Sequence, residues 1–167
     1  MRTDEVLTAA FDNIAGVVDA AVDGLTTDQL AQSPAPGTNS IAWLVWHLTR
    51  VQDDHVAEVA GHEQVYTADG WARRFDLPFP DEAHGYGMST EDAAKVRADA
   101  ELLVGYHHAV SAKTKEYLAT LSDADLDRVV DEGWDPPVTL GVRLVSVVTD
   151  DLQHAGQAAY VRGLLSV

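Results

Sequence analysis

The 167-residue chain contains no cysteine, so it has no disulfide framework, no thiolate metal ligand and no cysteine nucleophile. Any thiol chemistry must therefore use a thiol brought in from outside the chain. The sequence also lacks an apolar run approaching the roughly 20 residues that cross a bilayer. It contains no glycine-rich phosphate loop and no Ser-His-Asp motif. These absences exclude a membrane-spanning protein and several enzyme classes.

Basic residues are scarce. Lys and Arg number 11 against 27 Asp and Glu, which gives a formal net charge of −16. Arg73 and Arg74 are the only adjacent basic pair, so we expect neither nucleic acid nor a membrane surface as a partner. The first residues include Asp4, Glu5 and Asp12 and lack a basic-then-apolar leader, which favours a cytoplasmic location.

An apolar content of 46% and a charged content of 23% are typical of a globular protein, and the length fits a single domain over residues 1–167. Apolar residues recur at spacings of three and four, the period of an amphipathic helix, and no strand-period segment competes with this pattern. The sequence therefore predicts an all-α fold. We expect four long helices, over residues 4–25, 40–61, 89–121 and 140–165.

The connections are also informative. TTDQL in residues 26–30 and SDADLDRVV in residues 122–130 are each expected to form a short helical turn. Residues 62–89 hold several glycines, prolines and aromatics without a sustained period, which predicts a long structured loop that either covers a ligand site or seals one end of the core. Together these features indicate an antiparallel four-helix bundle with long connections, an architecture whose interior often holds metal ligands.

The second predicted helix carries several groups capable of chemistry. His47 lies beside the buried stripe and is expected to point inward, and Asp54 follows it by two helical turns. His55 lies on an adjacent line and is expected to face the same pocket. Taken alone, an inward histidine is more often a hydrogen-bonded core residue than a ligand, so this helix by itself favours a core role.

The last predicted helix contains Asp150 and His154, whose spacing of four places them one turn apart on one face. With His47 from a neighbouring helix they would form a three-ligand site with open positions, suited to zinc or another divalent cation. Asp151 is an alternative ligand, or it could orient an imidazole from outside the ligand set. The structural alternative is that Asp150 faces solvent and only pairs with His154.

The other histidines are expected to be peripheral. His107 and His108 are adjacent and cannot both face the core, so the inward one is expected to be structural or to line a pocket. His62 and His84 are expected to be exposed near loop residues, with the alternative that either reaches the site.

Two tryptophans and two arginines flank the motifs. Trp43 and Trp46 are expected to be core residues or, if exposed, part of a dimer surface. Arg50 and Arg162 are expected to form surface ion pairs, with neutralisation of an anionic substrate as the alternative.

The strings SIAWLVWHLTRVQDDH and LVSVVTDDLQHAGQAAYVRGLL resemble the DinB-like family. The similarity is greatest to its actinobacterial branch of uncharacterised domains, which is related to mycothiol-dependent maleylpyruvate isomerase and to bacillithiol S-transferases. It covers nearly the whole chain, and the run H-A-G-Q before an aromatic and R-G is its most specific part. The resemblance implies a four-helix bundle that holds a divalent metal through His47, Asp150 and His154.

The resemblance also implies an activity, an S-transfer or an isomerisation in which the metal activates a low-molecular-weight thiol or a water for attack on a small-molecule electrophile. Mycothiol is the expected thiol, and zinc is the expected metal ahead of nickel or another divalent ion. Asp54, His55 and Gln157 are candidates for orienting water, moving a proton or positioning the thiol. Two alternatives remain, a non-catalytic metal- or small-molecule-binding module and a structural or regulatory homodimer with a degenerate metal site.

Overall fold

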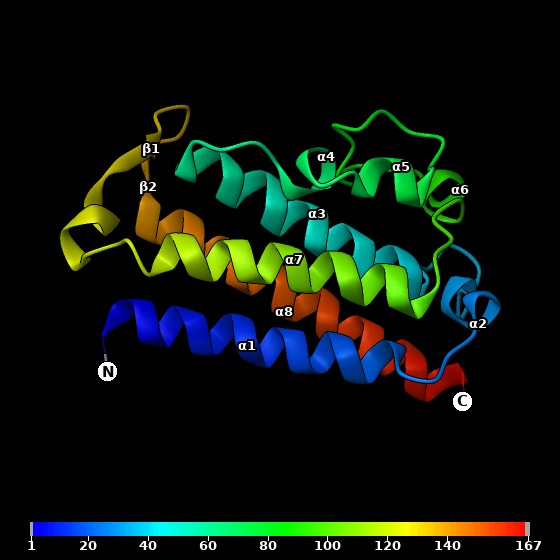
Figure 1. Cartoon of the computed structure of the whole chain (residues 1–167). Coiled ribbons are helices and arrows are strands. Elements are labelled where there is room, and N and C mark those ends of the chain that lie inside the picture. The colour runs from blue at the N-terminus through cyan, green and yellow to red at the C-terminus, as the bar shows by residue number, and fades with distance from the viewer. Residues whose placement is uncertain (1, 166–167) are drawn as a thin grey trace.

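The computed structural model describes residues 2–165 and is dominated by helices, so the expected all-α fold is confirmed. Within these residues, the helices of 19 residues or more are α1 (Thr3–Val22), α3 (Ile41–Ala60), α7 (Ala100–Leu118) and α8 (Leu140–Leu165), and they lie alongside one another in Figure 1. The boundaries of α3 and α8 agree closely with the ranges expected from the sequence.

Shorter elements occupy the connections. The short helices are α2 (Thr27–Ala31), α4 (Val65–Ala68), α5 (Trp71–Phe75), α6 (Thr90–Ala93) and the 3-10 helix η1 (Asp123–Asp127). The strands β1 (Val129–Asp131) and β2 (Val138–Thr139) form an antiparallel pair. The expectation of a helical turn through residue 130 is therefore correct only to Asp127, because the β-branched pair that follows enters a strand.

The order of packing determines where the site lies. Helix α8 packs against α3 and α1, and α7 packs against the same two helices, so α7 and α8 lie diagonally opposite each other. Figure 1 shows α1 and α8 running in one direction and α3 and α7 in the other. Since α3 and α7 are parallel, residues 61–99 must return along the length of the bundle, and they carry α4, α5 and α6 over one side of it.

Local capping explains the boundaries of α3. The Ser40 hydroxyl accepts a hydrogen bond from the Trp43 amide at 3.2 Å, which satisfies a free donor at the start of the helix. Gly61 ends the helix with φ of 73°, a left-handed conformation in which a side chain would be strained. The range expected from the sequence, residues 40–61, begins and ends at these two residues.

The expected long helix over residues 89–121 is wrong at its start. Ser89 caps only the single turn of α6, and a second cap follows at Asp99, whose carboxylate accepts from the Leu102 amide at 2.8 Å. Val96 lies between the two helices and is fully buried. The stabilisation from burying Val96 and from the cap at Asp99 exceeds the stabilisation that one continuous helix through this segment would provide.

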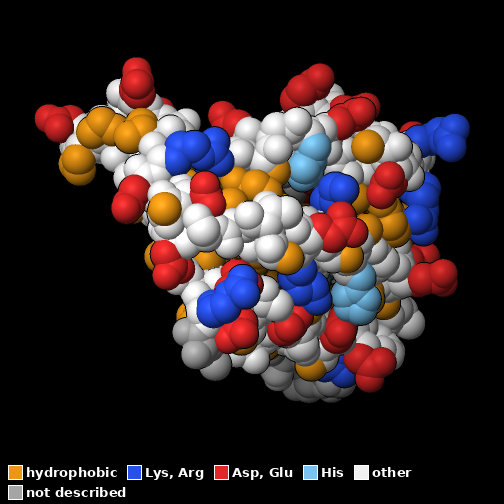
Figure 2. All heavy atoms as spheres, turned by 60° about the vertical axis from the view of Figure 1, so that its left-hand side comes forward, with side chains coloured by type: hydrophobic (Ala, Val, Ile, Leu, Met, Phe, Trp, Pro, Cys, Tyr) orange, Lys and Arg blue, Asp and Glu red, His pale blue; other side chains and the backbone are white. Residues whose placement is uncertain are grey.

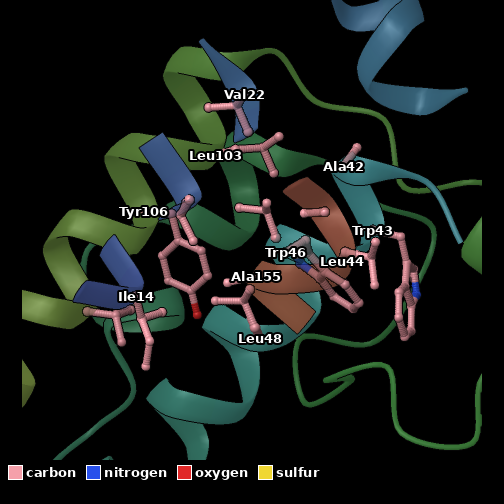
Figure 3. Close-up of a cluster of buried hydrophobic side chains, with 14 of the residues drawn as sticks. Ile14, Val22, Ala42, Trp43, Leu44, Trp46, Leu48, Leu103, Tyr106 and Ala155 are labelled. Atoms are coloured by element: carbon pink, nitrogen blue, oxygen red, sulfur yellow. The ribbon is translucent and has the colours of Figure 1, made fainter. Parts of the chain in front are cut away.

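Side chains from all four long helices converge on one core, part of which is drawn in Figure 3. Tyr106 reaches into it from α7, and Trp46 and Leu48 enter it from α3. Trp43 and Trp46 are both buried, so these tryptophans do not form an exposed dimer surface. Trp43 and Trp46 are therefore core residues, which was the first of the two expectations.

The surface carries dispersed charge. On the face in Figure 2, acidic and basic side chains are interspersed, and no continuous basic area is present there. Among the described residues, no helix combines the length and the apolar character required to cross a bilayer.

Arg50 is not a surface residue, contrary to the sequence expectation. Its side chain on α3 is fully buried. The guanidinium donates to the carbonyl oxygens of Asp81 at 2.8 Å and Ala83 at 3.1 Å, and to the Gln64 side-chain oxygen at 2.7 Å. It also lies over the Tyr66 ring, 4.1 Å from the centroid. A buried cation that is supplied with this many acceptors fixes the loop that provides them.

Asp53 provides the negative charge of the same buried group. Its carboxylate lies 3.7 Å from the Arg50 guanidinium and accepts hydrogen bonds from the Val65 and Tyr66 amides and from the Tyr106 hydroxyl. The group joins α3 to α4 and α7. Its role is thus to hold the crossover segment against the bundle.

His107 and His108 divide as expected, one inward and one outward. His108 is half-exposed and pairs with Asp19 of α1 at 2.9 Å. His107 is buried in the core, and burial lowers its pKa to about 4. The Thr49 hydroxyl donates to the Val45 carbonyl, so it accepts from Nδ1–H of His107 at 3.1 Å. His107 is therefore a neutral core residue.

This burial predicts a pH-dependent stability. Because the pKa of His107 is lowered to about 4 in the folded chain, the unfolded state alone gains a proton as the pH falls from about 6.5. The contribution of His107 to the free energy of unfolding is complete above pH 6.5. It should decrease by about 2 kcal/mol on going from pH 7.5 to pH 5. Denaturant unfolding at both pH values should show that His107→Gln loses this component and that His108→Gln retains it. An equal pH dependence in His107→Gln and the parent chain would contradict the assignment.

Candidate metal centre

The antiparallel packing of α3 against α8 brings together three of the residues singled out in the sequence. His47 of α3 and Asp150 and His154 of α8 each offer one ligand atom, and these atoms lie within 4.8 Å of one another. Among the described residues, this is the only such group of three or more His, Asp or Glu side chains.

His47 is held by contacts on two sides. Its Nδ1–H donates to the carbonyl oxygen of His84, and its ring stacks on Trp43 with the centroids 4.5 Å apart. The hydrogen bond leaves Nε2 as the atom with a free lone pair. Burial lowers the pKa of His47, against the opposing effect of the His84 carbonyl. A neutral imidazole with a fixed tautomer is the form that binds a metal.

His154 is oriented in the same manner by a different group. Its Nδ1–H donates to the Gln157 side-chain oxygen at 2.8 Å, and its Nε2 lies 3.6 Å from Oδ1 of Asp150. Asp150 raises the pKa of His154. Burial opposes ionisation of Asp150, but the imidazoles of His154 and His47 outweigh it and lower the pKa of this carboxyl. Gln157 thus contacts a candidate ligand and does not line the cleft described below.

The three residues fit a divalent cation. The Oδ2 atom of Asp150 is buried and has no hydrogen-bond partner among the described residues, so a ligand position on the carboxylate is available. Two imidazoles and one carboxylate form a donor set that zinc and other borderline divalent ions accept, with at least one position left for another ligand. His47, Asp150 and His154 are therefore the residues that would hold the metal.

Asp151, the alternative ligand, points elsewhere. Its side chain is fully buried in the core, and neither carboxylate oxygen has a partner among the described residues. Burial and the adjacent Asp150 raise the pKa of Asp151 well above its usual range, so its surroundings disfavour the ionised form. The structure places Asp150, and not Asp151, beside the two histidines.

A cleft of about 410 Å³ opens in front of His47 and Asp150. Asp54 and His55 of α3 line it, as the helical spacing suggested. Trp134 from the β1–β2 connection and Tyr86 from the loop before α6 also line it, and their side chains are 67% and 86% exposed. Large aromatic side chains left in water beside a polar site provide an apolar wall for a ligand.

Asp54 and His55 form a polar pair in this cleft. Oδ2 of Asp54 lies 3.8 Å from Nδ1 of His55, and Oδ1 accepts a hydrogen bond from Nε2 of the Gln64 side chain at 2.7 Å. Burial, and then the positive charge of Arg143, lower the pKa of His55. His55 is accordingly neutral near pH 7 and able to accept a proton. Its Nδ1 has no hydrogen-bond partner among the described residues.

His84 lies at the site. The sequence analysis gave this as the alternative to an exposed position for the two loop histidines. The contact to His47 uses the main-chain carbonyl, whereas the His84 side chain lines the cleft. His62 instead lines a separate cleft of about 520 Å³ with Asp54 and other acidic residues. A main-chain carbonyl that accepts a hydrogen bond leaves no signature in the sequence. The role of the His84 carbonyl could therefore not be inferred from residue type.

Gly85 permits the loop to approach this closely. A Cβ at this position would lie 2.6 Å from Nδ1 of His47 and 3.2 Å from the Trp43 and Trp46 rings, and the φ angle is +97°. Only glycine fits both the conformation and the space. Gly87, two residues later, has φ of +70° and nothing within 4 Å of a Cβ.

Comparison with known proteins identifies the family of the chain and a solved structure with the same fold. The mycothiol S-transferase family model matches residues 6–166. A crystal structure of a conserved protein from Enterococcus faecalis is 33% identical, covers 99% of this chain and 98% of its own, and superposes with a TM-score of 0.93. No curated protein matches the chain. The chain belongs to the mycothiol S-transferase family of the DinB-like superfamily.

Proposed function

We propose that this protein is a divalent-metal-dependent S-transferase that joins a low-molecular-weight thiol, mycothiol in the first instance, to a small-molecule electrophile. The observation that carries the proposal is the convergence of His47, Asp150 and His154 at a cleft lined by a neutral histidine and two exposed aromatics. Family membership supports the choice of thiol. The absence of cysteine is consistent with a nucleophile supplied by a cosubstrate.

The metal, zinc ahead of nickel or another divalent ion, would supply Lewis-acid stabilisation of a thiolate at neutral pH. His55 is a candidate to accept the thiol proton, because its imidazole is neutral and lines the cleft. Asp54 would stabilise the imidazolium that results, since it lies 3.8 Å away and is itself held by Gln64. Gln157 acts indirectly, by fixing the tautomer of His154.

The walls of the cleft determine what the electrophile meets. Tyr86 and Trp134 offer flat apolar surfaces, and Val51 and Val147 also line the cleft. In the reaction, a sulfur–carbon bond forms, the bond from carbon to the leaving group breaks, and the thiol proton passes to His55. A cytoplasmic location and a homodimeric state complete the proposal. The alternative functions are a non-catalytic binding module and a regulatory dimer.

The role of Gly85 yields a test of metal binding. Gly85→Ala would push the loop away from Nδ1 of His47 and free the ring, so we expect the affinity for zinc to fall about 10- to 100-fold. Gly87→Ala is the matched control, because it introduces similar backbone strain with no neighbouring atom. Competition with a chromophoric chelator measures both. Equal affinities in the two variants would contradict the orienting role of the His84 carbonyl.

The transferase activity is tested with mycothiol and a panel of fluorogenic and haloaromatic electrophiles. The zinc-loaded protein should accelerate conjugation, and removal of the metal should abolish the acceleration. His55→Gln should lower kcat about 100-fold with the metal still bound, because the proton acceptor is lost. His108→Gln, on the opposite face of α7, should leave kcat unchanged. A metal-loaded protein that conjugates no member of the panel would favour the binding-module alternative.

A further inference from the structure

The outward face of α8 differs from the rest of the surface. Its exposed apolar residues are Val142, Val145, Leu152, Tyr160 and Leu164, each between 51% and 69% exposed. They recur at spacings of three, seven, eight and four, so they lie on one face of the helix. No exposed residue between positions 142 and 164 carries a charge. This set of outward residues is called the α8 face below.

Such a face is unusual for this chain. Charged residues make up 23% of the sequence, the net charge is −16, and α1 exposes Glu5 and Asp12 on its own outer side. The lack of charge on the α8 face, along the longest described helix, is therefore not a consequence of the overall composition. Continuous apolar surface of this kind is typical of an interface.

We propose that the α8 face pairs with the α8 face of a second copy of this chain, with the two helices antiparallel and the two-fold axis near Leu152. A second copy presents an uncharged surface of the same shape by construction, whereas an oppositely charged partner would leave its basic groups unpaired. Two chains of net charge −16 repel each other, and a contact surface without charged residues adds no further repulsion at the interface.

The order of large and small residues favours the antiparallel arrangement. With the axis near Leu152, Tyr160 of each copy lies opposite Val145 of the partner copy, and Thr149 lies opposite Gly156, so each bulky group meets a smaller one. A parallel arrangement would place Tyr160 against its own counterpart and Gly156 against another glycine, which separates the helices where close packing is needed.

The size of the face predicts a modest affinity. Helix α8 has 26 residues and is about 39 Å long, and a strip about 13 Å wide would bury about 500 Å² on each copy. A total near 1,000 Å² lies at the lower end of specific interfaces, so we expect a dissociation constant in the micromolar range. Salt should tighten the dimer, because it screens the repulsion between the two acidic chains.

Sedimentation equilibrium of the full chain between about 1 and about 100 μM should show a monomer–dimer equilibrium that shifts to dimer with added salt. Leu152→Glu should weaken association more than 10-fold. Ala112→Glu adds the same charge at an exposed alanine of α7, which lies diagonally opposite α8, and should leave association unchanged. Circular dichroism establishes that both variants fold. A wild-type chain that stays monomeric throughout, or a dimer unaffected by Leu152→Glu, would overturn the proposal.

The absence of native cysteine permits a direct test of register, because each single substitution introduces the only thiol in the chain. Under mild oxidation, Leu152→Cys should form a disulfide-linked dimer by itself. Val142→Cys and Leu164→Cys should not do so alone, but a mixture of the two should cross-link. Self-linked dimers from all three variants would indicate parallel helices and overturn the arrangement. These outcomes do not depend on metal binding or transferase activity.

Discussion

The burial of the Arg50 guanidinium is the constraint on which the candidate site depends. A cation without solvent requires acceptors on every side, and two of those acceptors are the main-chain carbonyls of Asp81 and Ala83. The loop that provides them is therefore fixed on α3, and the next residue, His84, is carried to His47. The orientation of a candidate ligand thus follows from a charged group that lies three residues further along α3.

The two imidazoles are oriented by different kinds of group. A loop carbonyl holds His47, whereas Gln157, on the same helix, holds His154 one turn away. The first contact depends on the tertiary fold and the second only on helical spacing. The crossover segment between α3 and α7 is consequently both the wall of the cleft and part of the support for the site, which joins its folding to the formation of the metal centre.

The sequence predicted what depends on periodicity and local capping. The extents of α3 and α8, the cap at Ser40 and the end at Gly61 follow from apolar spacing and residue preference. The approach of His47 to Asp150 and His154 follows from one spacing of four and one inward histidine, with the resemblance to the DinB-like family providing the link between two helices.

The other features of the fold and of the candidate site depend on tertiary contacts that cannot be recognised in a single sequence. Arg50 was expected at the surface because arginine is usually solvated, and only the tertiary structure reveals the acceptors that permit its burial. The break before Asp99 results from competition between two caps and the burial of Val96. Trp134 lines the cleft because it lies in the connection between the paired strands β1 and β2. The apolar spacing of the sequence did not predict these strands.

X-ray absorption spectroscopy of the zinc-loaded protein tests the central claim most directly, because it identifies the atoms around the metal. The account predicts a shell containing two imidazole nitrogens at about 2.0–2.1 Å together with oxygen, and the loss of one imidazole in each of His47→Ala and His154→Ala. A shell composed only of oxygen, or one that is unchanged in these two variants, would contradict the assignment of the metal to His47, Asp150 and His154.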